Sequence, residues 1–245
     1  MRMRSVRRGG ALGAVVAASL ILGAMPASAA PGDGSAFAAK VSVTLLGQPA
    51  ANVGPLAPSN TNGPTSASVA SINAAGLVTA GLVTSKAELN EETGGVHAQA
   101  DLANVGIALG ALSGKISAVN ATCDATQAGT KGSSTLAGVS LPGVSVPVNP
   151  APNTTIDLVL AKIIFNEQIS GPDGSLTVNA VHVKLNALVG KGDVILAQAK
   201  CGPAAPPVPL ASGLGLWVGL GLVGLAAIPV GGMVIRKRRT ATAAA

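Results

Sequence analysis

Residues 31–209 of this 245-residue chain contain no arginine, no tryptophan and no tyrosine, and Phe37 and Phe165 are their only aromatic residues. Aromatic side chains supply much of the buried area of ordinary protein cores. The core of this segment must therefore be filled by valine, leucine, isoleucine and alanine. We expect such a core to pack thinly and to need reinforcement.

Basic residues are also scarce in residues 31–209, which argues against a nucleic-acid role. The segment holds all ten acidic residues of the chain and eight lysines, so its formal charge is −2, although the whole chain carries +6. Nucleic-acid binding depends on clustered lysine and arginine side chains that neutralise phosphates. The basic charge belongs instead to the two ends of the chain.

The N-terminal end has the pattern of a secretory signal peptide. Four arginines within the first eight residues precede an apolar run from 11 to 25, and the small residues 27–29 follow it. This order predicts export with cleavage between Ala29 and Ala30. The pair Arg7-Arg8 is followed by two glycines rather than by bulky apolar residues. Ordinary secretion is therefore favoured over the twin-arginine route.

The C-terminal end has the pattern of a membrane anchor. Residues 213–235 are uncharged and mostly apolar, and a helix of about 20 such residues spans a bilayer. The basic residues that follow should stay in the cytoplasm and stop transfer: Arg236, Lys237, Arg238 and Arg239. We predict a single-pass protein of the plasma membrane with five regions: signal peptide 1–29, extracellular β-rich ectodomain 30–201, proline-rich spacer 202–209, transmembrane helix 210–235 and cytoplasmic tail 236–245.

Cysteine is limited to Cys123 and Cys201, both in the predicted ectodomain. Disulfides form and persist in oxidising, exported locations. We therefore predict a bridge between the two cysteines, with two free buried thiols as the alternative. The chain-entropy model gives a loop of about 80 residues roughly 4 kcal/mol of stabilisation.

Apolar and polar residues alternate along three stretches of the ectodomain: 37–45, 96–102 and 181–185. A period of two is typical of half-buried strands. In the first stretch, the pattern places Phe37 on the buried face together with Val41 and Val43. Glycine and proline are too frequent in the ectodomain for long helices.

Turn-forming residues separate these stretches, notably Gly171–Gly174 and Glu91–Gly95. We predict an all-β ectodomain, an antiparallel β-sandwich or a barrel-like sheet, with a single C-terminal transmembrane helix. The alanine and glycine residues at 74–82 leave room for one short helix. Three segments have an irregular pattern: 48–66, 126–134 and 141–155.

A weak internal repeat relates residues 105–115 to residues 181–191 at a constant offset. Each copy is followed by a predicted strand that ends in a cysteine, Cys123 in the first and Cys201 in the second. The repeat suggests two similar hairpins stapled to each other. Chance similarity in a sequence rich in alanine, glycine and valine is the alternative.

Residue patterns for catalysis and metal binding are missing. His97 and His182 are the only histidines, and neither has a cysteine or an acidic residue beside it at ligand spacing. We interpret both as polar residues on the outer faces of strands. No nucleophile elbow and no phosphate-binding loop is present. We therefore predict no catalytic residue, no metal ligand and no cofactor.

Several stretches resemble the choice-of-anchor P family of actinobacterial surface proteins: 34–46, 53–60, 144–153, Asn166-Glu167-Gln168, 178–185 and 192–196. The resemblance implies one type of ectodomain joined to interchangeable C-terminal anchors, some of which sortase recognises. This chain departs from the sortase type, because residues 202–210 contain no threonine and so no Leu-x-x-Thr-Gly signal. The resemblance implies no catalytic residues.

These patterns favour a non-catalytic surface protein with a structural, adhesive or interaction role. The alternative is a binding module for an apolar or lipidic envelope molecule, which would need a lined cavity between sheets, and a cell-wall enzyme is the third choice. The expected partners are the membrane, through the C-terminal helix, and other envelope components, but not nucleic acid. The oligomeric state is left open.

Overall fold

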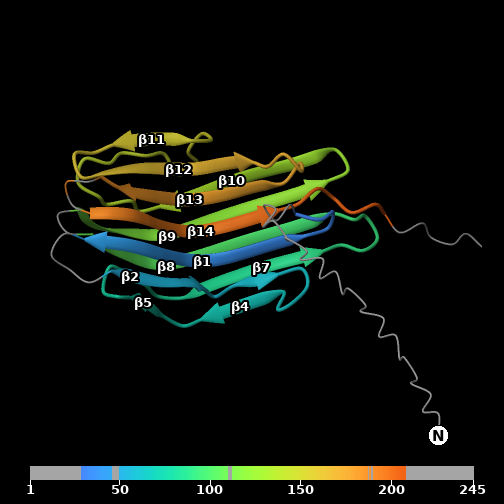
Figure 1. Ribbon diagram of the computed structural model, residues 1–245, viewed down its shortest axis with the longest axis horizontal. Coiled ribbons are helices and arrows are strands. Elements are labelled where there is room, and N and C mark those ends of the chain that lie inside the picture. Colours follow the sequence, from blue (N-terminus) through green and yellow to red (C-terminus); the bar gives the residue numbers. More distant parts are fainter. Residues whose placement is uncertain (1–28, 46–49, 110–111, 187, 189, 208–245) are drawn as a thin grey trace, which may run out of the picture.

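The computed structural model describes residues 29–45, 50–109, 112–186, 188 and 190–207. These residues form fourteen strands and no helix, arranged as two antiparallel sheets of seven strands (Figure 1). The all-β prediction is therefore confirmed for this part of the chain. Residues 1–28 of the predicted signal peptide, the predicted helix 210–235 and the basic tail 236–245 lie outside the described residues. Within the described ranges, no helix has the length and apolar character needed to cross a membrane.

Sheet A runs in the order β11-β12-β13-β14-β1-β2, with β3 paired to β1. The first and last strands of the chain are neighbours in this sheet, because β1 pairs with β14 along its whole length. The strands are β1 (Gly34–Leu45), β2 (Ala51–Leu56), β3 (Ser59–Asn60), β11 (Thr154–Asp157), β12 (Ala161–Ser170), β13 (Leu176–Leu185) and β14 (Gly190–Cys201).

Sheet B is built around the long hairpin of β8 and β9, with β10 beside β9, and β6 and β7 both beside β8. Strands β5 and β4 pair with β6 and β7 respectively. The strands are β4 (Ser66–Val69), β5 (Ile72–Ala74), β6 (Val78–Ala80), β7 (Val83–Leu89), β8 (Val96–Leu109), β9 (Leu112–Thr126) and β10 (Gly129–Ala137).

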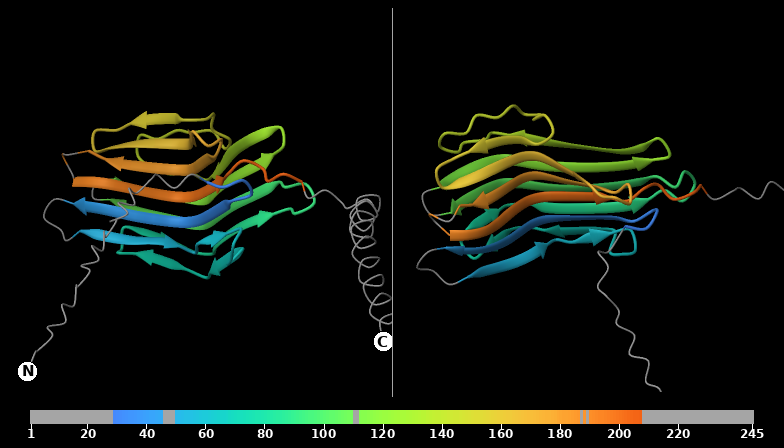
Figure 2. Two further views of the ribbon diagram at one scale, coloured as in Figure 1. Left: turned by 45° about the vertical axis from the view of Figure 1, so that its right-hand side comes forward. Right: turned by 45° about the horizontal axis from the view of Figure 1, so that its top comes forward.

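The two sheets pack face to face, with β14 over β8 and β9. Figures 1 and 2 show the two layers. The core between them is aliphatic, and Phe165 is its one fully buried aromatic side chain among the described residues. Alternation along β8 matches the prediction, since Val96, Ala98, Ala100 and Leu102 are all buried.

In sheet A, one row of residues that runs across the strands interrupts the alternation of side chains. On either side of this row, the side chains that face the core differ in parity along the strand. On β14, Leu196 and Ala199 both face the core, although residues three apart in a regular strand point to opposite sides. The reversal occurs at Ala197, whose φ is 51°. The strand register aligns Ala197 with one residue on each of three other strands: Ala38 of β1, Ala180 of β13 and Asn166 of β12.

Sheet B contains a matching row. Leu102 and Val105 on β8 are both buried, and Asn104 between them has a φ of 54°. Across the sheet, Asn104 aligns with Ser117 of β9 and with Gly138, which follows β10. Gly138 has a φ of 61°, and a Cβ atom there would collide with the Ser117 hydroxyl. Figure 2 shows strands that change direction part-way along their length. We call the row through Ala197 in sheet A and the row through Asn104 in sheet B the bend rows.

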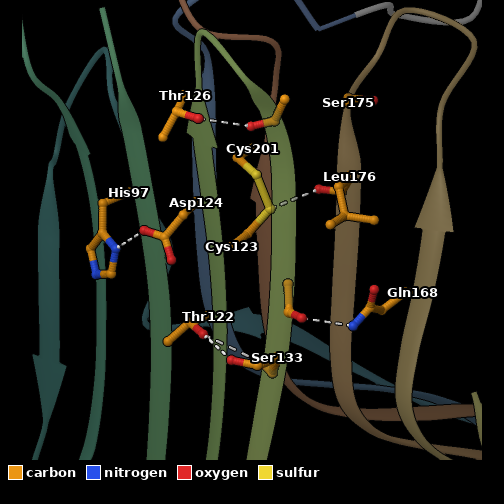
Figure 3. The surroundings of a disulfide bond; sticks show 12 residues. His97, Thr122, Cys123, Asp124, Thr126, Ser133, Gln168, Ser175, Leu176 and Cys201 are labelled. Atoms are coloured by element: carbon orange, nitrogen blue, oxygen red, sulfur yellow. Dashed lines mark hydrogen bonds and ion pairs between the residues drawn. A yellow bond between two sulfur atoms is a disulfide. The ribbon is translucent and has the colours of Figure 1, made fainter. Parts of the chain in front are cut away.

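A disulfide joins the sheets on one side of the bend rows. Cys123 of β9 and Cys201 of β14 are fully buried and bonded, with their Cα atoms 5.7 Å apart (Figure 3). Packed sheets are usually about 10 Å apart, so the layers approach closely here. Small side chains allow this approach, because buried alanines dominate the core on this side: Ala36, Ala98, Ala100, Ala121, Ala125 and Ala199.

A polar contact also ties the two sheets. Gln168 of β12 donates a hydrogen bond from Nε2 to the Gly132 carbonyl oxygen of β10 over 2.8 Å. Near the disulfide, the sulfur of Cys123 lies 3.3 Å from the Leu176 carbonyl oxygen. That contact is not a hydrogen bond, because a disulfide sulfur carries no hydrogen.

The internal repeat corresponds to two hairpins, one in each sheet. Residues 105–115 cover the turn between β8 and β9, and residues 181–191 cover the turn between β13 and β14. The second strand of each hairpin carries a cysteine of the disulfide. The two hairpins also share the bend, since Asn104 and Ala180 are separated by the offset of the repeat.

Three predictions about local structure are wrong. Phe37 is partly exposed rather than buried, because the bend row at Ala38 separates it from Ala39, Val41 and Val43. Residues 74–82 form no helix, since β5 and β6 pair as a hairpin there. The segments 48–66 and 126–134 contain β2, β3 and most of β10. The predicted irregular segment 141–155 is free of strands up to residue 153, but its last two residues begin β11.

The domain has two different ends. Residues 29–33 and 202–205 lie together at one end, which we call the terminal pole, joined by hydrogen bonds from Gly32 N to Pro203 O and from Gly202 N to Asp33 O. Strand β14 starts at the opposite end, which we call the loop pole. Leu158–Leu160 and the β13–β14 turn meet there, where Asn186 bonds the Val159 and Leu160 carbonyl oxygens.

Candidate functional site

The outer face of sheet A carries a cluster of polar side chains around His182. The His182 Nδ1 lies 2.6 Å from Glu167 Oε2, and its Nε2 lies 3.1 Å from Asp193 Oδ1. Asn179 donates to the same Glu167 oxygen over 2.6 Å, and Gln198 donates to Asn179 over 2.7 Å. Three adjacent strands, β12, β13 and β14, therefore contribute to one network, which we call the His182 cluster.

The bend row creates this cluster. Asn179 and His182 are three residues apart on β13, so a regular strand would direct them to opposite faces. The reversal at Ala180 brings both to the outer face, where both contact Glu167. The prediction that His182 is a polar residue on the wet face of its strand is only half right. The side chain points to the outer face, but it is buried, with 10% exposed, as is that of Glu167.

Opposing effects act on the Glu167 carboxyl group. Burial raises its pKa, but the hydrogen bonds from Asn179 and His182 lower it, and the positive charge of Lys184, whose Nζ lies 3.6 Å from Oε1, adds to the lowering. The net result is a Glu167 pKa below its ordinary value. Glu167 is therefore held as a carboxylate that three neighbours use as an acceptor.

The contacts of His182 suit a structural tie better than a catalytic base. A catalytic histidine needs one ring nitrogen directed at a nucleophile or a substrate proton. Here both ring nitrogens face carboxylates, and among the described residues neither contacts a hydroxyl or thiol group. In the described part of the chain, no three histidine, cysteine, aspartate or glutamate side chains are placed so that they could hold a metal ion together.

The outer face of sheet B carries the other histidine. His97 Nδ1 lies 2.6 Å from Asp124 Oδ1 on the neighbouring strand β9 (Figure 3). Gln99 follows on β8 and donates to Asp101 over 2.9 Å, and Asn120 donates to the other Asp101 oxygen over 2.7 Å. This chain of polar contacts, which we call the His97 cluster, is half exposed to solvent.

The carboxylate of Asp124 sets the charge state of His97. The hydrogen bond between them raises the His97 pKa above 6.5, and this effect outweighs the lowering caused by partial burial. Neither histidine approaches the other, because they lie on the outer faces of two different sheets, with the core between them. A metal site shared by His97 and His182 is therefore ruled out by the fold.

An open hollow of about 750 Å³ adjoins His97 near the terminal pole. Its rim carries the carboxylates of Glu88, Glu91 and Asp124. Glu88, His97 and Asp124 occupy one row across β7, β8 and β9. Glu88 is already paired with Lys86, 2.8 Å away, and the apolar side chains of Leu89 and Val96 also line the hollow.

The spacer begins in contact with the terminal pole. Ala205 N donates to Gly94 O over 2.8 Å, and Gln127 Nε2 donates to Ala205 O over 2.6 Å. Gly94 has a φ of 69°, and a Cβ atom there would collide with the Ala205 carbonyl group. Residues 202–205 thus pack on the turns β7–β8 and β9–β10 instead of leaving the domain directly.

No protein-family model, no curated protein and no solved structure matches this chain. The resemblance to the choice-of-anchor P family thus remains an expectation from the residues alone. Function has to be argued from the geometry of the domain and from the pattern of its two ends.

The predicted site residues fall into three groups. The structure joins Cys123 and Cys201 as predicted, and it places Ala29 and Ala30 at the terminal pole beside Gly202. The predicted stop-transfer residues lie outside the described residues: Arg236, Lys237, Arg238 and Arg239.

The carboxylate partners of the histidines were missed by sequence reasoning. Asp124 is 27 residues from His97, and Glu167 is 15 residues from His182. A search for ligands beside each histidine in the chain cannot find partners that strand pairing brings across the sheet. The register of the β8–β9 hairpin alone aligns His97 with Asp124.

Proposed function

We propose that this protein is exported, is held in the plasma membrane by the helix 210–235, and presents the domain 30–201 on the cell surface for non-catalytic contacts with other envelope components. The observation that carries the proposal is the difference between the two ends of the domain. Residues 29–33 and 202–205 lie together at the terminal pole, and among the described residues the two most exposed large apolar side chains, Val159 and Leu188, lie at the loop pole.

The terminal pole is suited to face the membrane. Residues 202–205 pack against it, and only four spacer residues, 206–209, separate these contacts from the proposed helix. An extended proline-rich segment covers about 3 Å per residue, so the terminal pole would stay close to the outer membrane face. The proposed positive-inside tail holds the other end of the helix in the cytoplasm.

The loop pole is suited to contact a partner. Val159 is 78% exposed and Leu188 is 68% exposed, on two turns that Asn186 joins. Exposed apolar side chains that gather at one place often mark interaction sites. At the opposite end of the domain from the anchor, these two side chains would be the first to meet another envelope component.

The resemblance to the choice-of-anchor P family agrees with this proposal, because that family joins one ectodomain type to different anchors. Here the absence of a Leu-x-x-Thr-Gly signal in residues 202–210 leaves the helix itself as the anchor. The contacts of His182, both of whose ring nitrogens face carboxylates, support a non-catalytic role.

The test is photo-cross-linking on intact cells that produce the full chain. A photoreactive residue at Leu188 should give a discrete cross-linked product, because the loop pole carries the contact. The matched control is a photoreactive residue at Ile169, which is 51% exposed on β12 near the terminal pole. We expect that position to give no such product.

The double change Val159→Asp and Leu188→Asp should abolish the cross-link from a photoreactive residue placed at Asn186, whereas Ile169→Asp should leave it intact. Equal cross-linking from Leu188 and Ile169, or no effect of the double change, would contradict a contact at the loop pole.

A further inference from the structure

Two carboxylates accept hydrogen bonds from the first backbone nitrogens of the described chain. Ala29 N donates to Asp173 Oδ2 over 2.6 Å, and Ala30 N donates to Asp33 Oδ2 over 2.8 Å. Asp33 N returns a bond to Ala30 O over 3.0 Å, which closes a turn. A carboxylate thus lies beside the nitrogen of the bond between Ala29 and Ala30, where export processing is predicted.

The fold fixes the position of this turn independently of Asp33. Gly32 N donates to Pro203 O over 2.9 Å, and Gly202 N donates to Asp33 O over 2.7 Å. A Cβ atom at Gly202 would lie 2.8 Å from Ala30 O, so the two ends of the domain are in close contact. Backbone bonds at Gly32 and Asp33 therefore hold the turn that carries the Ala30 nitrogen beside Gly202, the residue after Cys201.

We propose that Asp33 binds the α-ammonium group that processing creates at Ala30, so that the new N-terminus is a structural element of the terminal pole. This inference rests on the proposed export. Processing hydrolyses the amide bond, so that water leaves a carboxylate on Ala29 and an amine on Ala30. The amine takes up a proton at neutral pH, since the ordinary pKa of an α-amino group is about 7.7 to 8.0.

The charges around the new ammonium group favour its binding. Asp33 lies on the same turn, and Asp173 on the β12–β13 turn loses the Ala29 N–H once that residue is removed. Lys200 of β14 is the cation on this side, and it lines a hollow of about 250 Å³ together with Ala29 and Asp33. Two carboxylates and one lysine leave a net attraction for the ammonium group.

The test uses the exported full chain in detergent and its variant Asp33→Asn. The pH dependence of acetylation by acetic anhydride, followed by mass spectrometry of the N-terminal peptide, measures the pKa of the α-amino group. An exposed ion pair should raise this pKa by about half a unit. Asp33→Asn should remove the rise.

The matched control is Asp157→Asn. This change removes an exposed carboxylate of β11 at the other end of the domain, 3.8 Å from Lys162 of β12. It should leave the pKa of the α-amino group unchanged, and thermal unfolding of all three proteins checks that each is folded. A mature N-terminus at a residue other than Ala30 would overturn the processing step, and with it this inference. A start at Ala30 with equal pKa values in the wild type and Asp33→Asn would overturn the binding role of Asp33 alone.

Discussion

His182 and His97 both face carboxylates, but the two clusters differ in burial and so in their consequences. Around His182, the side chains of the histidine and of Glu167 are each 10% exposed. Around His97, the histidine and Asp124 are 40% and 53% exposed. Water screens the second pair, and exposed ion pairs contribute little to stability. The His182 cluster is therefore the one whose loss should be felt by the whole fold.

Replacing Glu167 with glutamine should destabilise the protein by about 1–3 kcal/mol, because buried donors on Asn179 and His182 lose a charged acceptor. Denaturant unfolding at pH 7 measures this change. Glu88→Gln, which removes a half-exposed partner of Lys86, is the matched control and should have little effect. Similar losses for the two variants would show that the cluster is not a structural tie.

The same carboxylate makes stability depend on acid. The folded pKa of Glu167 is lowered, so its contribution is present above the unfolded value near 4.5 and is lost as pH falls through the folded value. The wild type should thus lose more stability than Glu167→Gln between pH 5 and lower pH. Parallel stability curves for the two proteins over this range would contradict the assignment.

His97 should show the opposite dependence. Its folded pKa is raised, so its small contribution is complete below pH 6.5 and is lost as pH rises through the folded value. Replacing Asp124 with asparagine removes the main cause and should move the His97 pKa back toward its ordinary value. Titration of the imidazole signals by NMR measures both values, and an unchanged His97 pKa in the variant would refute the pairing.

At the scale of elements, the bend rows connect strand geometry to the outer faces. Each row holds alternating residues of positive φ, Asn166 and Ala197 in sheet A, and Asn104 and Gly138 in sheet B. Positive φ is costly for residues that carry a Cβ atom. The rows persist because pairing continues in register on both sides of them, and they bring Asn179 and His182 to one face.

Ala197 allows a direct test of this geometry. Ala197→Gly should be neutral or stabilising by up to about 1 kcal/mol, because glycine adopts positive φ without strain. The control is Ala199→Gly, at a buried position of the same strand without positive φ, and it should destabilise by about 1 kcal/mol. Denaturant unfolding compares the two, and equal losses would show that Ala197 is not strained.

The sequence predicts the regular strands better than it predicts the bends. Alternation from Val96 to Leu102 identified β8 correctly, because a regular strand keeps one face buried. The same rule failed at Phe37, since the bend row changes the buried face within β1. Two buried neighbours in succession, such as Ala38 and Ala39, are the local signal of a bend, but an alanine-rich sequence hides it.

Strands β2, β3 and β10 were missed because their sequences carry no clear strand pattern. Residues 51–60 and 129–137 are rich in residues with low strand propensity, and only pairing with β1 and β9 makes them strands. The cysteine pairing was predictable because the sequence contains only two cysteines, whereas the repeat was too weak in the sequence to be told from chance similarity. The carboxylates around the histidines were not predictable, because their positions depend on the register between strands.

For the whole molecule, the disulfide is the main reinforcement of an aliphatic core. It joins the sheets where alanines bring them close, and it links positions 78 residues apart. Replacing both cysteines with serine should cost about 4 kcal/mol, as measured by denaturant unfolding against the oxidised wild type. Alkylation of the denatured, unreduced wild type should add no label, whereas labelling at both cysteines would show that the bridge does not form.

The proposed orientation of the molecule depends on the predicted anchor, residues 210–235. Four consecutive basic residues after an apolar segment should stop transfer firmly, because each charge at the bilayer centre costs several kcal/mol. The helix should then remain part of the mature protein, and the spacer should keep the terminal pole near the membrane. In the proposed orientation, the loop pole would be the end that meets the surroundings.

The most direct test of this account is the intact mass of the protein recovered from fractionated cells. The full chain should be found with the membranes, should dissolve only in detergent, and should have the mass of residues 30–245, while a chain truncated after Pro209 should appear in the medium. Release of the full-length gene product by muralytic digestion, with a mass that lacks residues 210–245, would contradict the retained helix and the orientation built on it.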